Sequence, residues 1–324
     1  MEIKSRFVTS NGIRMHVAEQ GSGPLVVLCH GFPEGWYSWR HQIRALAEAG
    51  YWAVAPDQRG YGQTDRPEST DAYTLCHLVG DIVGLVRALG RDQAFIVGHD
   101  WGAAVAWHCA LLRPDIFRSL SLLSVPYISN FWGGPKPTDV MRMMFGGKVF
   151  YQLYFQEPGK AERDLEEDVR TALRRLYYSA SGDPPPEKRW RFIMEPSERL
   201  MDTVSEPDAM PAWFSEQDLE FYTREFQRVG FRGALNWYRN LDRDSELLAF
   251  LSGARIVQPA LFIAGAVDPV IAMYREAFDA LEQNIPDLRG KHLLPGAGHW
   301  IQQERAEEVS RLLLKFLEER RSVL

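Results

Sequence analysis

Residues 98–102, Gly-His-Asp-Trp-Gly, place an acid where the chain turns from an apolar segment into a helix-forming one. Residues 94–97 are apolar and predict a short buried strand, and the mostly small residues 103–107 predict a helix. A nucleophile flanked by small residues between a strand and a helix is typical of a nucleophile elbow, a strained turn that lifts one side chain above a sheet. An aspartate presented there can attack carbon and form an ester that water then cleaves.

Asp100 also has a purely structural interpretation. Aspartate is common at the start of a helix, where its carboxylate accepts hydrogen bonds from backbone N–H groups. The glycines at 98 and 102 favour the elbow, because a sharp turn leaves no room for Cβ atoms against the neighbouring backbone. The pentapeptide alone leaves both interpretations open.

An ester on Asp100 needs an activated water, and a histidine oriented by a carboxylate is the usual base. Asp268 follows a predicted strand at 260–264, and His299 lies in the loop beyond the next strand. Functional groups in open α/β sheets gather at the carboxyl ends of the strands, so we expect both side chains beside Asp100. The order nucleophile, acid, histidine is the one expected of the α/β-hydrolase fold. The other seven histidines lie before the elbow, at turns, in helical segments or at a strand start, and we expect structural roles for them.

Residues 30–33, His-Gly-Phe-Pro, follow an apolar run at the point where this fold places half of an oxyanion hole. The backbone N–H groups of Phe32 and Trp101 are therefore predicted to hold the oxygen that becomes negative when water attacks the ester. The alternative is a simple loop in which Phe32 only packs. The sequence leaves the cis or trans state of the bond to Pro33 open.

The remaining chain predicts the elements that must position these groups. Apolar segments alternate with helical segments, which indicates a mostly parallel sheet covered by helices on both faces. The predicted strands are residues 6–9, 13–18, 24–29, 51–56, 94–97, 118–123, 260–264 and a strand that closes at 292–294. The predicted helices are residues 38–49, 76–89, one from the elbow to about 113, one starting near 271, and a final helix with apolar residues at 309, 312, 313, 316 and 317.

Residues 129–250 differ from the rest, with helices broken by Gly-Pro loops and no clear strand. This segment holds 20 of the 39 aromatic residues, more than its share of the length, which suits a lid over an apolar cavity. We therefore expect an α/β core formed by residues 1–128 and 251–324 and a helical cap domain formed by residues 129–250.

Composition and charge limit the partners. A length of 324 residues allows a substantial core, and the net charge of -6 argues against nucleic acid or an anionic membrane surface as the main partner. No run reaches the length of a membrane span, and residues 1–6 lack the apolar stretch of a secretory signal. The three cysteines, Cys29, Cys76 and Cys109, show no metal-ligand spacing, and Cys29 and Cys109 are expected to be buried. The simplest location is a reducing cytoplasm.

Six segments together resemble the α/β-hydrolase-fold epoxide hydrolases of the soluble type. They span nearly the whole chain and comprise residues 30–34, 57–62, 98–102, 151–159, 231–240 and 298–300. The first three and the last are shared widely among relatives of this fold. The two segments in the predicted cap, 151–159 and 231–240, are much more specific to epoxide hydrolases.

The resemblance implies hydrolysis of a small apolar epoxide to a vicinal diol through a hydroxyalkyl ester on Asp100, without cofactor or metal. It implies that Tyr151 and Tyr238 give a proton to the epoxide oxygen. From the residues alone both would be core aromatics, and Tyr154 would compete equally with Tyr151. The substrate-binding positions that the resemblance implies are Phe32, Trp101, Gln152 and Trp300. The chain is expected to be a monomer or a homodimer.

The chemistry of an epoxide fits these residue types. A carboxylate can open the strained ring by direct displacement, but the leaving alkoxide is too basic to form at neutral pH without a proton donor. Phenols, with a pKa of about 10, stay protonated at pH 7 and are acidic enough to donate. Two such donors on one oxygen would act as an oxyanion hole built from side chains.

Two other functions remain open. A haloalkane dehalogenase would use the same aspartate and the N–H of Trp101, but halide leaves without a proton, and a second halide donor is expected near residue 32, where this chain has phenylalanine. A catalytically silent receptor for a small apolar ligand would not need the full set of catalytic groups. Serine-type esterases are disfavoured by Asp100.

Overall fold

The computed structural model describes residues 2–129 and 133–320. Residue 1, residues 130–132 and residues 321–324 lie outside the described residues. The internal gap falls just after the predicted start of the cap, and the terminal residues belong to the predicted core.

One eight-stranded sheet runs through the described residues in the order β1-β2-β4-β3-β5-β6-β9-β10. β1 pairs antiparallel with β2 and β2 with β4, whereas the other neighbours are parallel. The turn between β1 and β2 uses Asn11 and Gly12 at φ of 48° and 78°, which these two residue types tolerate. The predicted mostly parallel sheet is confirmed. Its strands are β1 (Lys4–Ser10), β2 (Ile13–Gly21), β3 (Leu25–Cys29), β4 (Trp52–Pro56), β5 (Ala94–His99), β6 (Phe117–Leu123), β9 (Ala260–Gly265) and β10 (Leu288–Leu294).

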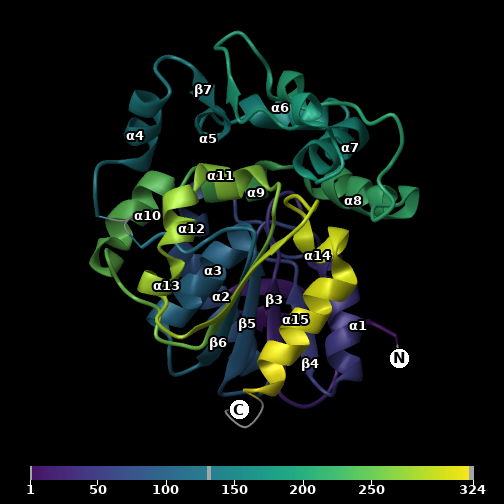
Figure 1. The fold of residues 1–324 in the computed structure, drawn as a ribbon, viewed down its shortest axis with the longest axis vertical. Helices are drawn as coiled ribbons and strands as arrows, with labels where there is room; N and C mark the ends of the chain where they lie inside the picture. The colour runs from purple at the N-terminus through teal and green to yellow at the C-terminus, as the bar shows by residue number, and fades with distance from the viewer. Residues whose placement is uncertain (1, 130–132, 321–324) are drawn as a thin grey trace.

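Helices cover both faces of the sheet (Figure 1). α1 (Arg40–Glu48) and α15 (Ala306–Glu318) pack on one face, and α2 (Leu75–Ala88) and α3 (Trp101–Leu112) pack on the other. Alternate residues of β3 point into the two apolar layers, Val26 into the first and Val27 into the second. The predicted apolar face of the last helix is confirmed, because residues 309, 312, 313, 316 and 317 are all buried.

Between β6 and β9 the chain forms a helical insert above the carboxyl ends of the strands (Figure 1). Its helices are α4 (Pro137–Met144), α5 (Tyr151–Tyr154), α6 (Lys160–Glu166), α7 (Val169–Ala180), α8 (Glu216–Val229), α9 (Arg232–Tyr238) and α10 (Leu241–Leu247). The expectation of a strand-free insert is wrong in one place, because β7 (Val149–Phe150) pairs with β8 (Ile193–Met194). Strands of two residues are too short to produce an alternating pattern in the sequence.

Short helices make up the rest of the regular structure. They are α11 (Pro269–Met273), α12 (Arg275–Asp279), α13 (Leu281–Asn284), α14 (Ile301–Glu304) and the 3-10 turns η1 (Trp36–Trp39), η2 (Thr70–Tyr73), η3 (Pro186–Lys188), η4 (Leu200–Thr203) and η5 (Ala249–Leu251). Within residues 2–129 and 133–320, no helix combines the length and the apolar character needed to cross a bilayer.

Candidate active site

Asp100 lies in a strained turn between β5 and α3. Its φ of 52° and ψ of -121° fall in a region that a residue with a side chain rarely adopts. A Cβ atom on Gly98 would collide with the backbone of Gly102, and one on Gly102 would collide with the backbone of Cys29. Asp100 occupies the N-cap position of α3, but its side chain makes no capping hydrogen bond, so the strained turn presents the carboxylate as a nucleophile elbow would.

The two oxygens of the Asp100 carboxylate face different partners. Oδ1 accepts the backbone N–H of Phe32 at 2.9 Å, and Oδ2 lies 3.4 Å from Nε2 of His299. Burial raises the pKa of Asp100, but the hydrogen bond and positive charge of His299, together with the Phe32 N–H, outweigh burial and lower the pKa below its ordinary value. The carboxylate is therefore ionised and available as a nucleophile.

His299 bridges Asp100 and Asp268, as predicted from their order in the chain. Its Nδ1 lies 3.1 Å from Oδ2 of Asp268, while Oδ1 of Asp268 accepts the N–H of Val270 at 2.9 Å and so begins α11. Burial lowers the pKa of His299, but the charges and hydrogen bonds of Asp268 and Asp100 raise it well above its ordinary value. In the resting protein His299 is thus a protonated partner of the Asp100 carboxylate.

Two buried tyrosines of the helical insert lie above the elbow. Tyr151 begins α5 and Tyr238 ends α9, and their ring centroids are 6.1 Å apart. The Tyr238 ring stands perpendicular to the Trp101 ring with centroids 5.1 Å apart. The Gln156 side chain joins the two segments, because its Nε2 donates to the carbonyls of Gln152 and Tyr238 at 2.9 Å each. This link explains how residues 87 positions apart (238 minus 151) reach one site.

The structure brings Tyr151, and not Tyr154, to the site. The Tyr154 hydroxyl donates to Oδ2 of Asp164 at 2.7 Å inside the insert. The Tyr151 hydroxyl instead accepts a hydrogen bond from Nε2 of Gln152 at 3.0 Å, so its own proton can be donated to another acceptor. Burial raises the pKa of Tyr151 and of Tyr238 well above the ordinary value, so both phenols stay protonated at neutral pH.

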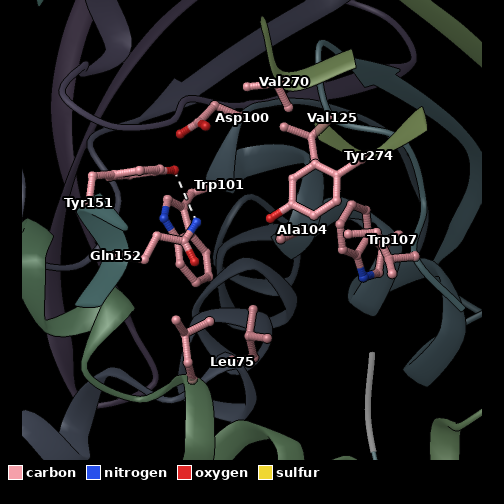
Figure 2. A pocket seen from close by; sticks show the side chains of 12 residues that line it. Leu75, Asp100, Trp101, Ala104, Trp107, Val125, Tyr151, Gln152, Val270 and Tyr274 are labelled. Carbon is pink, nitrogen blue, oxygen red and sulfur yellow. Dashed lines mark hydrogen bonds between the residues drawn. The ribbon is translucent and has the colours of Figure 1, made fainter. Parts of the chain in front are cut away.

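A mostly apolar cavity opens beside these groups. Asp100, Trp101, Tyr151 and Gln152 contribute to its lining, and Figure 2 shows the Tyr151 hydroxyl and the Asp100 carboxylate on the same side of it. The other lining residues are Leu75, Ala104, Trp107, Val125, Ile128, Leu241, Val270 and Tyr274. A largely apolar cavity with a few convergent polar groups is the usual form of a small-molecule site.

Comparisons with known proteins agree with this geometry. Residues 24–306 match the family described as the alpha/beta hydrolase fold. Epoxide hydrolase A of Mycobacterium tuberculosis is 45% identical over 314 residues, which cover 96% of each chain. An epoxide hydrolase structure from an endophytic Streptomyces matches with a TM-score of 0.95 and 48% identity over 99% of this chain and 96% of that one. Epoxide Hydrolase A from Mycobacterium thermoresistibile matches with a TM-score of 0.91 and 44% identity over 98% of both chains.

The chain belongs to the epoxide hydrolase family of the α/β-hydrolase fold. In this epoxide hydrolase, the Phe32 N–H holds Asp100, and the Phe32 ring packs edge-on against Tyr238 with centroids 5.5 Å apart. The Phe32–Pro33 bond is cis. Trp300 is fully buried behind His299, where its indole N–H donates to the carbonyl of Tyr177 at 2.8 Å, and it is not among the cavity-lining residues.

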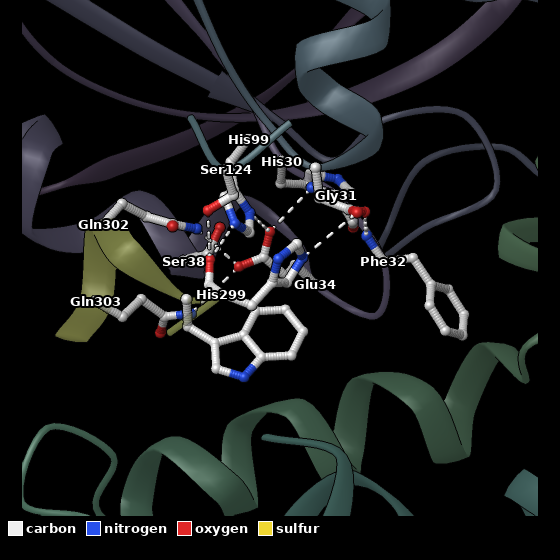
Figure 3. A network of polar contacts seen from close by, with 12 residues as sticks. His30, Gly31, Phe32, Glu34, Ser38, His99, Ser124, His299, Gln302 and Gln303 are labelled. Atoms are coloured by element: carbon white, nitrogen blue, oxygen red, sulfur yellow. Dashed lines mark hydrogen bonds and ion pairs between the residues drawn. The ribbon is translucent and has the colours of Figure 1, made fainter. Parts of the chain in front are cut away.

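A buried pair, His99 and Glu34, holds the loop of His299 in this epoxide hydrolase (Figure 3). Nδ1 of His99 lies 2.8 Å from Oε2 of Glu34, and Nε2 of His99 donates to the carbonyl of His299 at 2.8 Å. Glu34 also accepts from the Gly31 N–H and from the side-chain amides of Gln302 and Gln303. Burial raises the pKa of Glu34, but the charge and hydrogen bond of His99 and the hydrogen bond of the Gly31 N–H lower it below its ordinary value, so Glu34 accepts hydrogen bonds from the groups around it.

Sequence reasoning missed part of this support. His99 was expected to have a structural role, and its hydrogen bonds to Glu34 and to the carbonyl of His299 agree with that expectation, but Glu34 was not expected as its partner. A carboxylate directly after His-Gly-Phe-Pro, and a histidine directly before Asp100, were the available signals. Tyr274, which adds a hydroxyl to the cavity lining, carried no signal of its own.

Proposed function

We propose that this protein hydrolyses an apolar epoxide to a vicinal diol through an ester on Asp100, and that residues 129–250 form a cap domain that supplies the acids. The observation that supports this proposal is an ionised carboxylate close to two buried, protonated phenols. Asp100 and Tyr151 line one apolar cavity, and the Tyr238 ring packs against Trp101 with its centroid 6.1 Å from that of Tyr151. A carboxylate and a pair of weak acids are the groups that opening a strained cyclic ether requires.

In the first step, Oδ2 of Asp100 attacks an epoxide carbon. The new bond joins Oδ2 to that carbon, the ring C–O bond breaks, and Tyr151 or Tyr238 gives its proton to the leaving oxygen. Oδ2 is the attacking oxygen in this proposal because Oδ1 is held by the Phe32 N–H. Gln152 assists, since its hydrogen bond to the Tyr151 oxygen leaves the phenolic proton directed away from the amide.

In the second step, water attacks the ester carbon of Asp100. Esterification removes the negative charge of Asp100, so the pKa of His299 falls and its resting proton passes to the tyrosinate left by the first step. The neutral imidazole can then take a proton from water. The charge that develops on Oδ1 is stabilised by the N–H groups of Phe32 and Trp101. The intermediate then collapses, the bond from the ester carbon to Oδ2 breaks, and the diol leaves with the proton from His299. The remaining proton of the water, on the regenerated Asp100 carboxyl group, passes to His299 and restores the resting pair.

The substrate-binding roles follow from the same arrangement. We assign Trp101 and Gln152 to direct contact with the substrate because both line the cavity. We add Phe32 because its N–H holds Asp100 and its ring packs against Tyr238. Trp300 supports the base from behind, since it packs against His299 with ring centroids 4.9 Å apart. Neither substrate binding nor support of His299 needs a cofactor or a metal in this proposal.

The first test of the function is a product assay. With styrene oxide the protein is expected to release the vicinal diol over many turnovers, and with 1-bromobutane it is expected to release halide at least about 100-fold more slowly, because neither Phe32 nor the phenols supply a halide site. Diol formation is followed by chromatography and halide by ion analysis. Preferential halide release would support the dehalogenase alternative, and binding of styrene oxide without any turnover would support the receptor alternative.

The pH dependence of the two steps provides a second prediction. On the acid side, His299 becomes protonated in the ester and can no longer act as a base, whereas the lowered pKa of Asp100 keeps the nucleophile ionised. We therefore expect kcat to fall about tenfold per pH unit below the pKa of His299 in the ester, while the ester still forms. Acid-quenched samples analysed by intact-protein mass spectrometry should contain more ester as the pH falls. A decreasing ester fraction at low pH would contradict this order of steps.

A further inference from the structure

Glu304 is a buried carboxylate that accepts hydrogen bonds from three backbone N–H groups around the catalytic histidine. It ends α14, and its side chain lies outside the substrate cavity. Oε2 accepts the N–H of Gly298 at 2.8 Å, and Oε1 accepts the N–H of Trp300 at 2.9 Å. These two residues flank His299 directly, so one side chain holds the loop on both sides of the base.

The third donor comes from the helical insert. Oε2 of Glu304 also accepts the N–H of Gly182, in the segment after α7, at 2.9 Å. The end of α7 contacts the loop of His299 directly, because the His299 N–H donates to the carbonyl of Ala180, the last residue of α7, at 2.9 Å. A Cβ atom on Gly298 would collide with the backbone of Ser181. Glu304 therefore joins the base loop to the insert at a point where the two backbones are in close contact.

The nearest acid of the insert does not duplicate this role. Asp183 accepts from the hydroxyl of Ser181 at 3.1 Å and from the indole N–H of Trp213 at 2.7 Å. The carbonyl of His299 has its own donors, Ser124 and His99. The carbonyl of His299 is thus held by Ser124 and His99, whereas Glu304 accepts the N–H groups of the two neighbouring residues, Gly298 and Trp300.

We propose that Glu304 is a positioning residue for ester hydrolysis, which holds the loop of His299 against the insert so that the imidazole faces the ester carbon of Asp100. This inference rests on the proposed function, in which His299 acts as a base only in the second step. A small displacement of a catalytic group is enough to slow a reaction strongly. Loss of Glu304 should therefore slow hydrolysis of the ester and leave its formation nearly unchanged.

The test is Glu304→Gln, which keeps the shape of the side chain. Its single amide oxygen can still accept the N–H groups of Gly298 and Gly182. Its NH2 group then faces the Trp300 N–H, and two donors cannot form a hydrogen bond with each other. With styrene oxide we expect hydrolysis of the ester to slow about tenfold and ester formation to change less than about twofold. Rapid acid quench and intact-protein mass spectrometry measure both rates. When hydrolysis limits turnover, kcat and KM should fall together and kcat/KM should stay constant.

Glu307→Gln is the matched control, since Glu307 is an exposed carboxylate three residues further along. It should leave both rates unchanged. Glu304→Asp keeps an acceptor on both oxygens and is expected to recover part of the hydrolysis rate, and it serves as the test if Glu304→Gln does not fold.

The outcomes distinguish this inference from the proposed function. A merely structural role would lower the melting temperature or the active fraction, so that kcat falls at constant KM, and that result would overturn the inference. An unchanged ester lifetime in a folded variant would also overturn it. If the wild-type protein forms no diol at all, the proposed function itself fails.

Discussion

A protein carrying both Tyr151→Phe and Tyr238→Phe is expected to form the ester about 10⁴-fold more slowly than the wild type, and each single variant about 100-fold more slowly. Removing one preorganised donor from a developing negative oxygen typically costs about 10²- to 10³-fold in rate. Both phenols are buried and kept protonated, and phenylalanine supplies no donor in their place.

The measurement for the tyrosine variants is single-turnover formation of the ester with styrene oxide. Tyr154→Phe is the control, because Tyr154 is a neighbouring phenol whose hydroxyl is bound to Asp164. It should cost stability through the lost hydrogen bond and leave the rate of ester formation unchanged. Ester formation within about tenfold of the wild type in the double variant would exclude the phenols as the required acids.

His299→Gln is expected to stop turnover after the first ester forms. Glutamine has no basic nitrogen, so hydrolysis of the ester should slow at least about 10⁴-fold, the scale seen when a catalytic base is removed. Ester formation needs only the Asp100 carboxylate and the phenols, and we expect it to stay within about tenfold of the wild-type rate. A burst of one epoxide consumed per protein molecule, followed by no steady release of diol, is the expected time course.

The control for this variant is His292→Gln, in β10 and away from the site. It should turn over like the wild type. Steady diol release by His299→Gln would show that another group activates the water, and the assignment of the base would then be wrong.

The groups that perform the chemistry could be predicted largely from the sequence because the topology constrains them. Asp100, Asp268 and His299 each follow a strand of one parallel sheet, and the carboxyl ends of such strands meet at a single edge. The strain at Asp100 was also predictable, since the glycines at 98 and 102 indicated that the backbone is crowded there.

The supporting contacts could not be predicted, because they depend on packing between distant parts of the chain. Tyr151 and Tyr154 lie three residues apart in one short helix, and only the contact of Tyr154 with Asp164 separates their roles. Glu34 bonds Gln302, 268 positions away. Glu304 bonds Gly182, 122 positions away. No local pattern encodes such pairings, and acidic side chains are usually exposed unless they have a partner.

The central claim, covalent capture of the epoxide by Asp100, is tested most directly by mapping the adduct in His299→Gln. The folded variant is incubated with styrene oxide, quenched in acid, digested and analysed by tandem mass spectrometry. The account predicts one added styrene oxide on the peptide that contains Asp100, located on that side chain, and no adduct when Asp100→Ala is combined with His299→Gln. An unmodified Asp100 peptide, or the same adduct on a different residue, would contradict the account.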